Sequence, residues 1–268
     1  MTDLKGILEA TAALTAGPIV FLRGFRILRK RRLIADTPTA RIRSLAMGLV
    51  EVNGKVAPRS TVIAPFSARS CAYWEIDISS RSKNGWSVLH RDQSGNPFFL
   101  SDETGEALVY PHGAECKIPF GTDEQCSGLN LPPCYAEYLK AHGSVLITLE
   151  RAGRLRFRER VLEGGENVYV LGTAVPRPRE VVVADSDLLQ ATGTDDAATT
   201  RLRALDHEVV AVIRRGENET VFIISQESER ALMLEFGGQA LLQLTLGPAL
   251  ALFGLGYWLL MLSSGRWP

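Results

Sequence analysis

The pattern of apolar and polar positions divides the chain into three parts. Near the C-terminus, an uncharged apolar run of 23 residues extends from Ala240 to Leu262. At about 1.5 Å per residue, this run is long enough to cross roughly 30 Å of hydrocarbon. Tyr257 and Trp258 lie toward its far end, and amphipathic aromatic rings favour the membrane interface. We therefore predict a transmembrane helix over residues 240–262.

A second apolar segment lies near the N-terminus and is shorter. Only 13 uncharged residues, Ala10 to Leu22, separate Glu9 from Arg23. The segment spans a bilayer if these two charged side chains extend to opposite interfaces. Otherwise it lies flat as an interfacial helix. We favour the spanning alternative and place an N-terminal membrane helix with its basic flank at residues 7–28.

The stretch that follows this segment is strongly basic. It contains six basic residues and no acid: Arg23, Arg26, Arg29, Lys30, Arg31 and Arg32. An excess of Lys and Arg marks the cytoplasmic side of a membrane helix and also attracts anionic lipid. We predict a two-span cell-membrane protein with its intervening domain in the cytoplasm. The six basic residues, together with Tyr257 and Trp258, are the candidate membrane-interface residues.

Period-two alternation dominates the intervening domain, which we place at residues 33–236. Residues 98–110 predict a hairpin that turns at residues 103–105, and residues 208–225 predict another. Pro132 and Pro133 precede a short predicted helix, Cys134 to His142. Residues 190–200, rich in Ala, Thr, Asp and Gly, predict a flexible insertion. The predicted fold is mainly β, either an OB-like barrel or an irregular β-sandwich, with one short helix and flanking membrane helices.

One strand of this domain carries four arginines in alternate positions. We predict that residues 155–162 pair with residues 145–149 in a hairpin. Arg154, Arg156, Arg158 and Arg160 would then line one face at about 6.6 Å intervals. They are the candidate anion-binding stripe, suited to anionic lipid or single-stranded nucleic acid. The alternative is a solvated face paired with acids such as Glu150, Glu163 and Glu166, which we favour because no stacking aromatics are interleaved with the arginines on that face.

The charge distribution limits the classes of binding partner that we expect. From Leu33 to Glu235 there are 22 Lys and Arg residues against 28 Asp and Glu residues, a net charge of −6. A general nucleic-acid-binding domain would be basic, so we expect no nucleic-acid partner. The expected partners are the lipid bilayer and an unidentified protein. The pattern predicts no particular oligomeric state.

Motifs that indicate catalysis, metal binding or cofactor binding are few. His112, Cys116, Cys126, Cys134 and His142 lie within 31 residues, but zinc sites usually have ligands paired two to four residues apart. We therefore predict no metal and no cofactor. No nucleophile elbow, phosphate loop or dinucleotide fingerprint occurs in the sequence. No catalytic residue is assigned, and we lean toward a protein without enzymatic activity.

Several blocks resemble the GIDE family, whose domain is also called BAM, for "beside a membrane". The blocks, in the family's order, are Asp36–Thr39, Ile42–Ser44, Gly48–Glu51, Phe99–Val109, Gly165–Gly172 and Phe222–Ser225. The resemblance covers about residues 7–262. It implies a domain between two membrane helices, as in mitochondrial E3 ubiquitin ligases, where the domain faces the intermembrane space. Members of the family that lack the zinc-binding RING finger are typical of prokaryotes, so the resemblance suggests a prokaryotic source.

The ligases of this family carry a zinc-binding RING finger after the second helix. This sequence has no Cys-x-x-Cys and no cysteine after Cys134. We therefore carry over no ligase residue and expect a membrane-anchored, non-catalytic binding or scaffold module. One alternative is an accessory part of a ubiquitin-like ligation system with its catalytic domain on another chain. Another is an enzyme whose site is not recognisable in the linear sequence.

Overall fold

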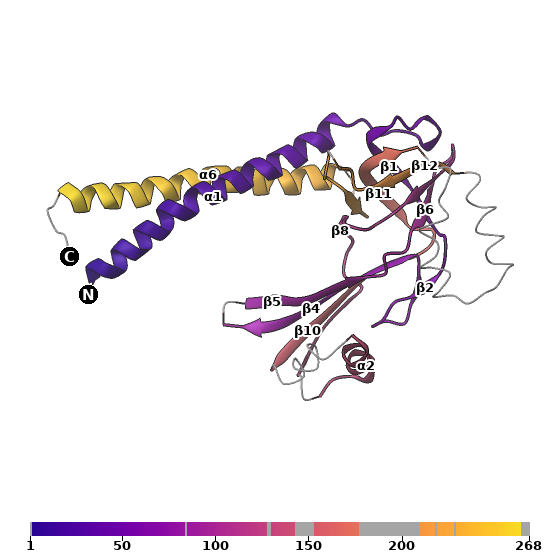
Figure 1. Ribbon diagram of the computed structural model, residues 1–268, viewed down its shortest axis with the longest axis horizontal. Helices are drawn as coiled ribbons and strands as arrows, with labels where there is room; N and C mark the ends of the chain where they lie inside the picture. Colours follow the sequence, from indigo (N-terminus) through magenta and orange to yellow (C-terminus); the bar gives the residue numbers. More distant parts are fainter. Residues whose placement is uncertain are drawn as a thin grey trace. The chain divides into compact units, whose positions relative to one another are not determined.

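The computed structural model describes residues 2–83, 85–127, 130–142, 153–176, 209–217, 219–227 and 229–263. The chain forms two compact units. One contains residues 1–37 and 228–268, and the other contains residues 38–227. The first is helical and the second is built from strands with one short α-helix (Figure 1).

The helical unit consists of two long α-helices, α1 (Thr2–Asp36) and α6 (Glu229–Ser263), each of 35 residues. Each helix extends beyond its predicted apolar run: α1 carries charged residues at both ends, and α6 carries them in its first two turns. Pro38 disfavours helical geometry at the residue before it, so α1 stops at Asp36. The Thr37 hydroxyl donates to the Leu33 carbonyl at 2.6 Å and satisfies one of the last carbonyls of the helix.

Small residues line the seam between α1 and α6. They recur every seven residues, as Ala10, Gly17 and Gly24 on α1 and as Ala240, Gly247 and Gly254 on α6. A Cβ at Gly17 would lie 2.7 Å from the Gly247 carbonyl oxygen, and one at Gly254 would lie 2.6 Å from the Ala10 carbonyl oxygen. The antiparallel backbones therefore approach so closely that side chains larger than these do not fit between them.

The outer surface of the helical unit is apolar. Fourteen large hydrophobic side chains are exposed on the two helices: Leu8, Ile19, Leu22, Phe25, Leu234, Leu241, Leu242, Leu246, Leu252, Phe253, Leu255, Leu259, Leu260 and Leu262. Both helices are long and apolar enough to cross a membrane. Along residues 10–24 and 240–262, the buried residues are thus small and the exposed residues include large ones, the reverse of a water-soluble helical pair.

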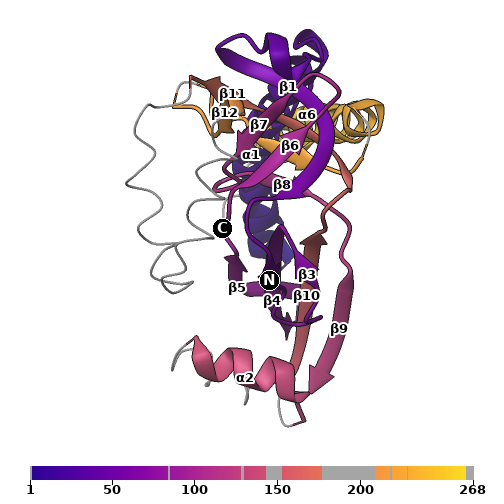
Figure 2. The same ribbon diagram turned by 90° about the vertical axis from the view of Figure 1, so that its right-hand side faces the viewer.

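Five strands of the β unit form a closed barrel, which confirms the barrel alternative for the mainly β fold. They are β1 (Gly48–Pro58), β6 (Phe98–Ser101), β7 (Glu106–Val109), β12 (Val209–Arg214) and β11 (Asn167–Val175). Pairing runs in that order, and β11 returns to β1 along a ladder from Gly48↔Ala174 to Lys55↔Asn167. The barrel strands lie together in Figure 2.

The barrel interior is filled by alternate side chains of its strands. Val52, Phe98, Leu100, Val170 and Ile213 are fully buried in this core. Full closure leaves no unpaired edge among these five strands. A short two-stranded ladder, β2 (Val62–Ile63) with β3 (Ser70–Cys71), follows β1 in the chain.

A second sheet has four strands in the order β5-β4-β10-β9. Its members are β4 (Tyr73–Ser82), β5 (Gly85–Gln93), β9 (Thr122–Ser127) and β10 (Arg154–Leu162). The predicted short helix is present as α2 (Pro133–Ala141), and its residues Tyr135, Tyr138 and Leu139 are buried. They pack with Ile76, Ile78 and Phe157 on one face of this sheet, which leaves the other face for polar side chains.

The hairpin predicted at residues 98–110 is confirmed. Strands β6 and β7 pair antiparallel from Phe98↔Val109 to Ser101↔Glu106. In the turn, Asp102 Oδ1 accepts hydrogen bonds from the backbone amides of Thr104 (2.6 Å) and Gly105 (3.0 Å). Its other oxygen accepts from the amide of Ile42 at 2.9 Å. Asp102 therefore joins the turn to the 3-10 helix η1 (Ile42–Ser44).

Replacing Asp102 with asparagine is expected to lower the free energy of unfolding at neutral pH by about 1–3 kcal/mol, because charge-assisted hydrogen bonds are lost. Burial raises the pKa of Asp102, but the hydrogen bonds from Ile42, Thr104 and Gly105 outweigh it, and the folded pKa lies below its usual value. The contribution is thus present above the unfolded pKa of about 4 and is lost as pH falls through the folded pKa. Denaturant midpoints measured from neutral to strongly acidic pH check this.

The wild-type and Asp102→Asn midpoints should converge as the pH falls below about 4. The neighbouring exposed Glu103→Gln serves as the control and should leave the midpoint within about 0.5 kcal/mol of wild type. A difference between Asp102→Asn and wild type that stays constant over the whole pH range would contradict a role for the carboxylate charge.

The prediction of a hairpin at residues 208–225 is wrong. Both strands exist, as β12 and β13 (Ile223–Ser225), but they do not pair with each other. Each pairs antiparallel with β11, at Thr173–Val175 and at Tyr169–Leu171. The two strands therefore lie one after the other along the same edge of β11 and do not fold back on each other. Between them, Phe222 packs against Gly172 of β11, where a Cβ would lie 2.8 Å from the ring.

Strand β13 also extends the barrel sheet beyond its closed part. It pairs in parallel with β8 (Glu115–Lys117), from Ile223↔Glu115 to Ser225↔Lys117. Two other sequence predictions, the strand at residues 145–149 and the insertion at residues 190–200, lie outside the described residues. Strand β10 has β4 and β9 as its described neighbours.

Candidate anion-binding face of the second sheet

Strand β10 places its four arginines on one face of the second sheet. Along β10, Leu155, Phe157 and Glu159 are buried, whereas the arginines between them are partly or fully exposed. Arg158 lies opposite Asp77 of β4, and Arg160 lies opposite Glu75. The face therefore carries acids from β4 beside the bases of β10.

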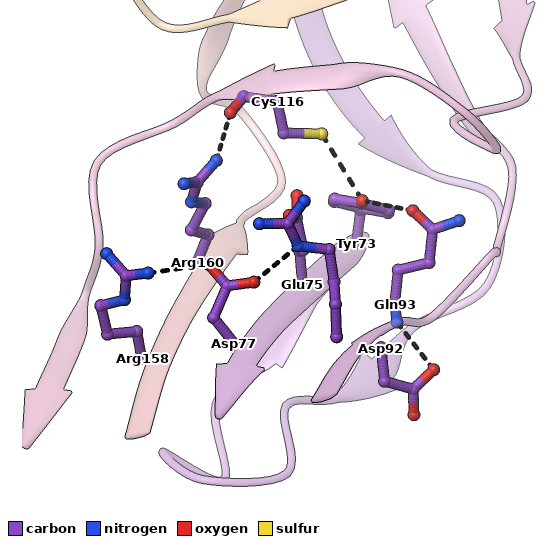
Figure 3. A network of polar contacts seen from close by, with 9 residues as sticks. Tyr73, Glu75, Asp77, Asp92, Gln93, Cys116, Arg158 and Arg160 are labelled. Carbon is purple, nitrogen blue, oxygen red and sulfur yellow. Dashed lines mark hydrogen bonds and ion pairs between the residues drawn. The ribbon is translucent and has the colours of Figure 1, made fainter. Parts of the chain in front are cut away.

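Two nearly buried carboxylates neutralise the part of this face nearest the start of β4. Asp77 is 1% exposed and Glu75 is 8% exposed. Asp77 accepts from Arg91 Nε at 2.6 Å and from Arg158 at 3.2 Å, as Figure 3 shows. Arg91 also lies 3.6 Å from Glu75. The hydrogen bond to Asp77 raises the pKa of Arg91, so this half is a compensated ion-pair network.

Beside this network, a chain of hydrogen bonds connects side chains of β8, β4 and β5. The Cys116 thiol donates to the Tyr73 hydroxyl at 3.5 Å, and that hydroxyl donates to Gln93 Oε1 at 3.0 Å (Figure 3). Arg160 donates to the Cys116 carbonyl. Burial raises the pKa of the Cys116 thiol to about 12 and also raises the pKa of Tyr73. Both groups are neutral at physiological pH and act as structural links, not as nucleophiles.

Aromatic rings stack on the arginines, contrary to the expectation from the sequence of β10. The Arg160 and Arg158 guanidiniums lie 4.1 Å and 4.4 Å from the centroid of Phe120. Trp86 lies beneath Arg81 at 5.5 Å and beneath Arg156 at 5.8 Å. The rings come from β5 and from the segment before β9, so the alternation within β10 gives no sign of them. Cation–π contacts of this kind contribute about 0.5–1 kcal/mol at exposed sites.

The part of the face toward the end of β4 carries excess positive charge. Arg156 binds Asp123 of β9 through Nε and Nη2, at 2.6 Å and 2.5 Å. This contact lowers the pKa of Asp123. Arg81 and Arg154 are exposed, and within the described part of the chain neither has an acidic partner. We call Arg81, Trp86, Val88, Arg154 and Arg156 the distal patch.

Two of the three acids expected to neutralise the stripe, Glu163 and Glu166, make other contacts. Glu163 pairs with Arg69 at 3.2 Å, and Glu166 accepts from the Glu163 amide at 2.8 Å. Glu150 lies outside the described residues. The pairing acids are Asp77 and Asp123, which are distant in sequence from β10 and were not singled out by the sequence analysis.

The cysteines and histidines considered as zinc ligands are distributed over different parts of the β unit. Cys116 lies in the barrel core, whereas Cys126 and Cys134 pack against the aromatic cluster under α2. His112 contacts Gln93, and His142 stacks on Tyr138. Among the described residues, no three side chains of His, Cys, Asp or Glu form a group able to hold a metal ion.

The candidate membrane-interface residues lie on the helical unit. Five of the six bases on α1 are exposed, namely Arg23, Arg26, Arg29, Arg31 and Arg32, and Lys30 is half-buried. Tyr257 and Trp258 are half-buried on α6. A Cβ at Gly6 would collide with the Tyr257 hydroxyl, so this ring packs against the first turns of α1. Bases and interfacial aromatics therefore occupy opposite ends of the helical pair.

The architecture defines a class of protein in which a β domain is continuous at both ends with long apolar helices. Residues 73–190 match the GIDE family, described as E3 ubiquitin ligase, and the resemblance to that family is thereby confirmed for this stretch. Comparison with curated proteins and with solved structures gave no match. The matched stretch contains the whole second sheet and α2, whereas β1, β12 and β13 lie outside it.

Proposed function

We propose that this protein is a membrane-anchored, non-catalytic binding module, in which α1 and α6 hold a GIDE-type β domain at the surface of the cell membrane. The observation that carries the proposal is the apolar outer surface of a helical pair whose seam is made of small residues. Exposed leucines and phenylalanines on two 35-residue helices match a lipid environment.

The β domain supports a binding role over a catalytic one. Burial raises the pKa values of the Cys71 and Cys116 thiols to about 11 and about 12, and it also raises that of Cys126. These thiols stay protonated at neutral pH and are poor nucleophiles. The most polar region, the mixed-charge face of the second sheet, is a surface of paired arginines and carboxylates suited to recognition of a charged partner.

Charge favours one orientation of this module. The six bases of residues 23–32 lie at the end of α1 next to the β domain. The positive-inside rule therefore places the β domain in the cytoplasm and both chain ends outside. Partner proteins would then be cytoplasmic. A prokaryotic cell membrane is the setting suggested by the resemblance to RING-less members of the family.

Fractionation and cysteine labelling test the proposal. The chain should stay with membranes after alkaline carbonate washing and dissolve only in detergent. In a variant with alanine at all four native cysteines, Lys5→Cys, Glu103→Cys and Leu262→Cys report the two ends and the β domain. A membrane-impermeant maleimide should label the two ends in intact cells and reach position 103 only after permeabilisation.

The outcomes separate the parts of the proposal. Release of the chain by carbonate would refute membrane anchoring. Retention with labelling at position 103 alone would reverse the orientation and leave the anchoring intact. Labelling at only one end would mean that one of the two helices does not cross the bilayer.

A second candidate function is favoured by the family match. The matching family is described as E3 ubiquitin ligase, so the β domain is a candidate accessory part of a ubiquitin-like ligation system with its catalytic domain on another chain. This candidate requires co-purification with a zinc-binding protein that transfers a ubiquitin-like modifier. Affinity purification in mild detergent, followed by zinc analysis of the complex, distinguishes it from a module that recruits other partners.

A further inference from the structure

The distal patch combines positive charge with exposed apolar surface. The guanidiniums of Arg81 and Arg156 lie over the Trp86 ring, and Val88, two residues along the same strand, is 47% exposed. Leu89, 42% exposed, follows Val88 where the register between β4 and β5 shifts. Lys83, also exposed, lies in the turn that connects the two strands. A surface with this composition suits a membrane interface, which offers anionic headgroups beside apolar chains.

The two halves of the face differ in what they can still bind. Arg91 and Arg158 already share Asp77, and Arg160 is bound to the Cys116 carbonyl. In the distal half, Asp123 neutralises Arg156 only, and Arg81 and Arg154 contribute two charges that no described acid balances. The unbalanced charge therefore lies beside the exposed apolar residues and not over the buried network.

We propose that the distal patch is a docking surface for the anionic headgroups of the bilayer in which the protein is anchored. This inference rests on the proposed function. Only Thr37 separates α1 from the β unit, and only Ser228 separates the β unit from α6. The β domain is therefore tethered to the helices at both ends, so in the proposed arrangement it meets lipid headgroups without a separate diffusional encounter.

Other anions suit the patch less well. Single-stranded nucleic acid is bound by stacking bases on free aromatic rings, whereas the Trp86 ring is half-buried and already lies against Arg81 and Arg156. An acidic polypeptide would pair with the arginines but gives no reason for the exposed Val88 and Leu89. Each basic residue near an anionic membrane surface strengthens binding by about fivefold, so Arg81 and Arg154 together correspond to about 30-fold.

The test uses the full-length chain in lipid nanodiscs. In the cysteine-free background, Val88→Cys carries an environment-sensitive fluorophore. Nanodiscs contain phosphatidylcholine alone or a mixture with phosphatidylserine. We expect a blue-shifted emission and protection from iodide quenching only with phosphatidylserine. Arg81→Gln combined with Arg154→Gln should lower the ratio of docked to free domain about 30-fold.

A matched control removes the same charge elsewhere. Arg43 and Lys55 are exposed residues outside the second sheet, and Arg43→Gln combined with Lys55→Gln should retain docking. Near-ultraviolet circular dichroism verifies that each variant folds. If a variant does not fold, the lipid dependence of the unsubstituted chain still decides the question.

The remaining outcomes overturn the inference in distinguishable ways. Failure of the chain to enter nanodiscs would refute the membrane anchor itself. Entry with identical fluorescence in both lipids would refute headgroup docking and leave the anchor standing. The same blue shift in neutral nanodiscs on addition of soluble glycerophosphoserine or polyglutamate would identify a soluble anion or an acidic polypeptide as the ligand, and would also refute docking to lipid.

Discussion

Replacing Gly247 with leucine is expected to separate α1 from α6 and to lower the free energy of unfolding by about 3 kcal/mol or more. A Cβ at this position would lie 2.8 Å from Phe21 Cβ and 2.9 Å from the Gly17 carbonyl oxygen. Neither neighbour is the flexible end of a side chain, so the helices must move apart and lose their close packing. Unfolding in detergent by increasing fractions of dodecyl sulfate measures the effect.

The matched control is Gly256→Leu on the same helix. A Cβ at Gly256 meets no atom within 4 Å, so the added side chain extends into free space. This variant should unfold within about 0.5 kcal/mol of wild type. Equal destabilisation by the two substitutions would show that helix propensity or micelle contacts, and not the seam, determine the result.

Replacing Phe157 with alanine is expected to cost about 3–5 kcal/mol of stability and to loosen α2 from the second sheet. The ring is fully buried. It stacks on Tyr135 of α2 with centroids 4.3 Å apart and meets Phe66 edge-on at 5.6 Å. A cavity at this position removes the main contact of α2. Denaturant unfolding gives the global cost, and hydrogen exchange of the α2 amides gives the local one.

A graded pair of substitutions makes this result interpretable. Phe157→Leu keeps much of the volume and should cost less than Phe157→Ala. Val88→Ala, at an exposed position on β5 of the same sheet, should stay within about 0.5 kcal/mol of wild type. Unchanged exchange of the α2 amides in Phe157→Ala would show that the helix is held by contacts other than this aromatic cluster.

The elements that depend on local signals could be predicted from the sequence. Alternation gave the strands, the Glu103-Thr104-Gly105 turn gave the β6–β7 hairpin, and the paired prolines gave the start of α2. The choice between a barrel and a sandwich could not be made from the sequence, because it depends on β1 and β11, which pair across more than a hundred residues. The parallel pairs β7–β12 and β8–β13 were missed for the same reason. Period-two patterns fix which residues share a face but not which strands meet.

The candidate site could likewise be predicted from the sequence only in part. The spacing of Arg154 to Arg160 predicts one shared face, and the structure places them so. Their partners come from β4, β5 and β9, and nothing in the sequence of β10 identifies Asp77, Asp123 or Trp86. One available signal was overlooked: Asn84-Gly85 is a strong hairpin marker. It predicts a hairpin between the strands that carry Arg81 and Trp86, and in the structure these two strands do pair.

The seam between the helices has a consequence for biosynthesis. Gly17 packs against Gly247, so α1 finds its partner only after some 230 further residues have been translated. In the membrane-anchored arrangement that we propose, and at about 5–20 residues per second, the first helix stays in the bilayer without this partner for roughly 10–50 s. During that interval its small, weakly apolar seam residues face lipid. The basic run at residues 23–32 is then the main part of the helix that binds the membrane interface. Shortening that run should therefore impair insertion of the nascent chain more than it lowers the stability of the finished protein.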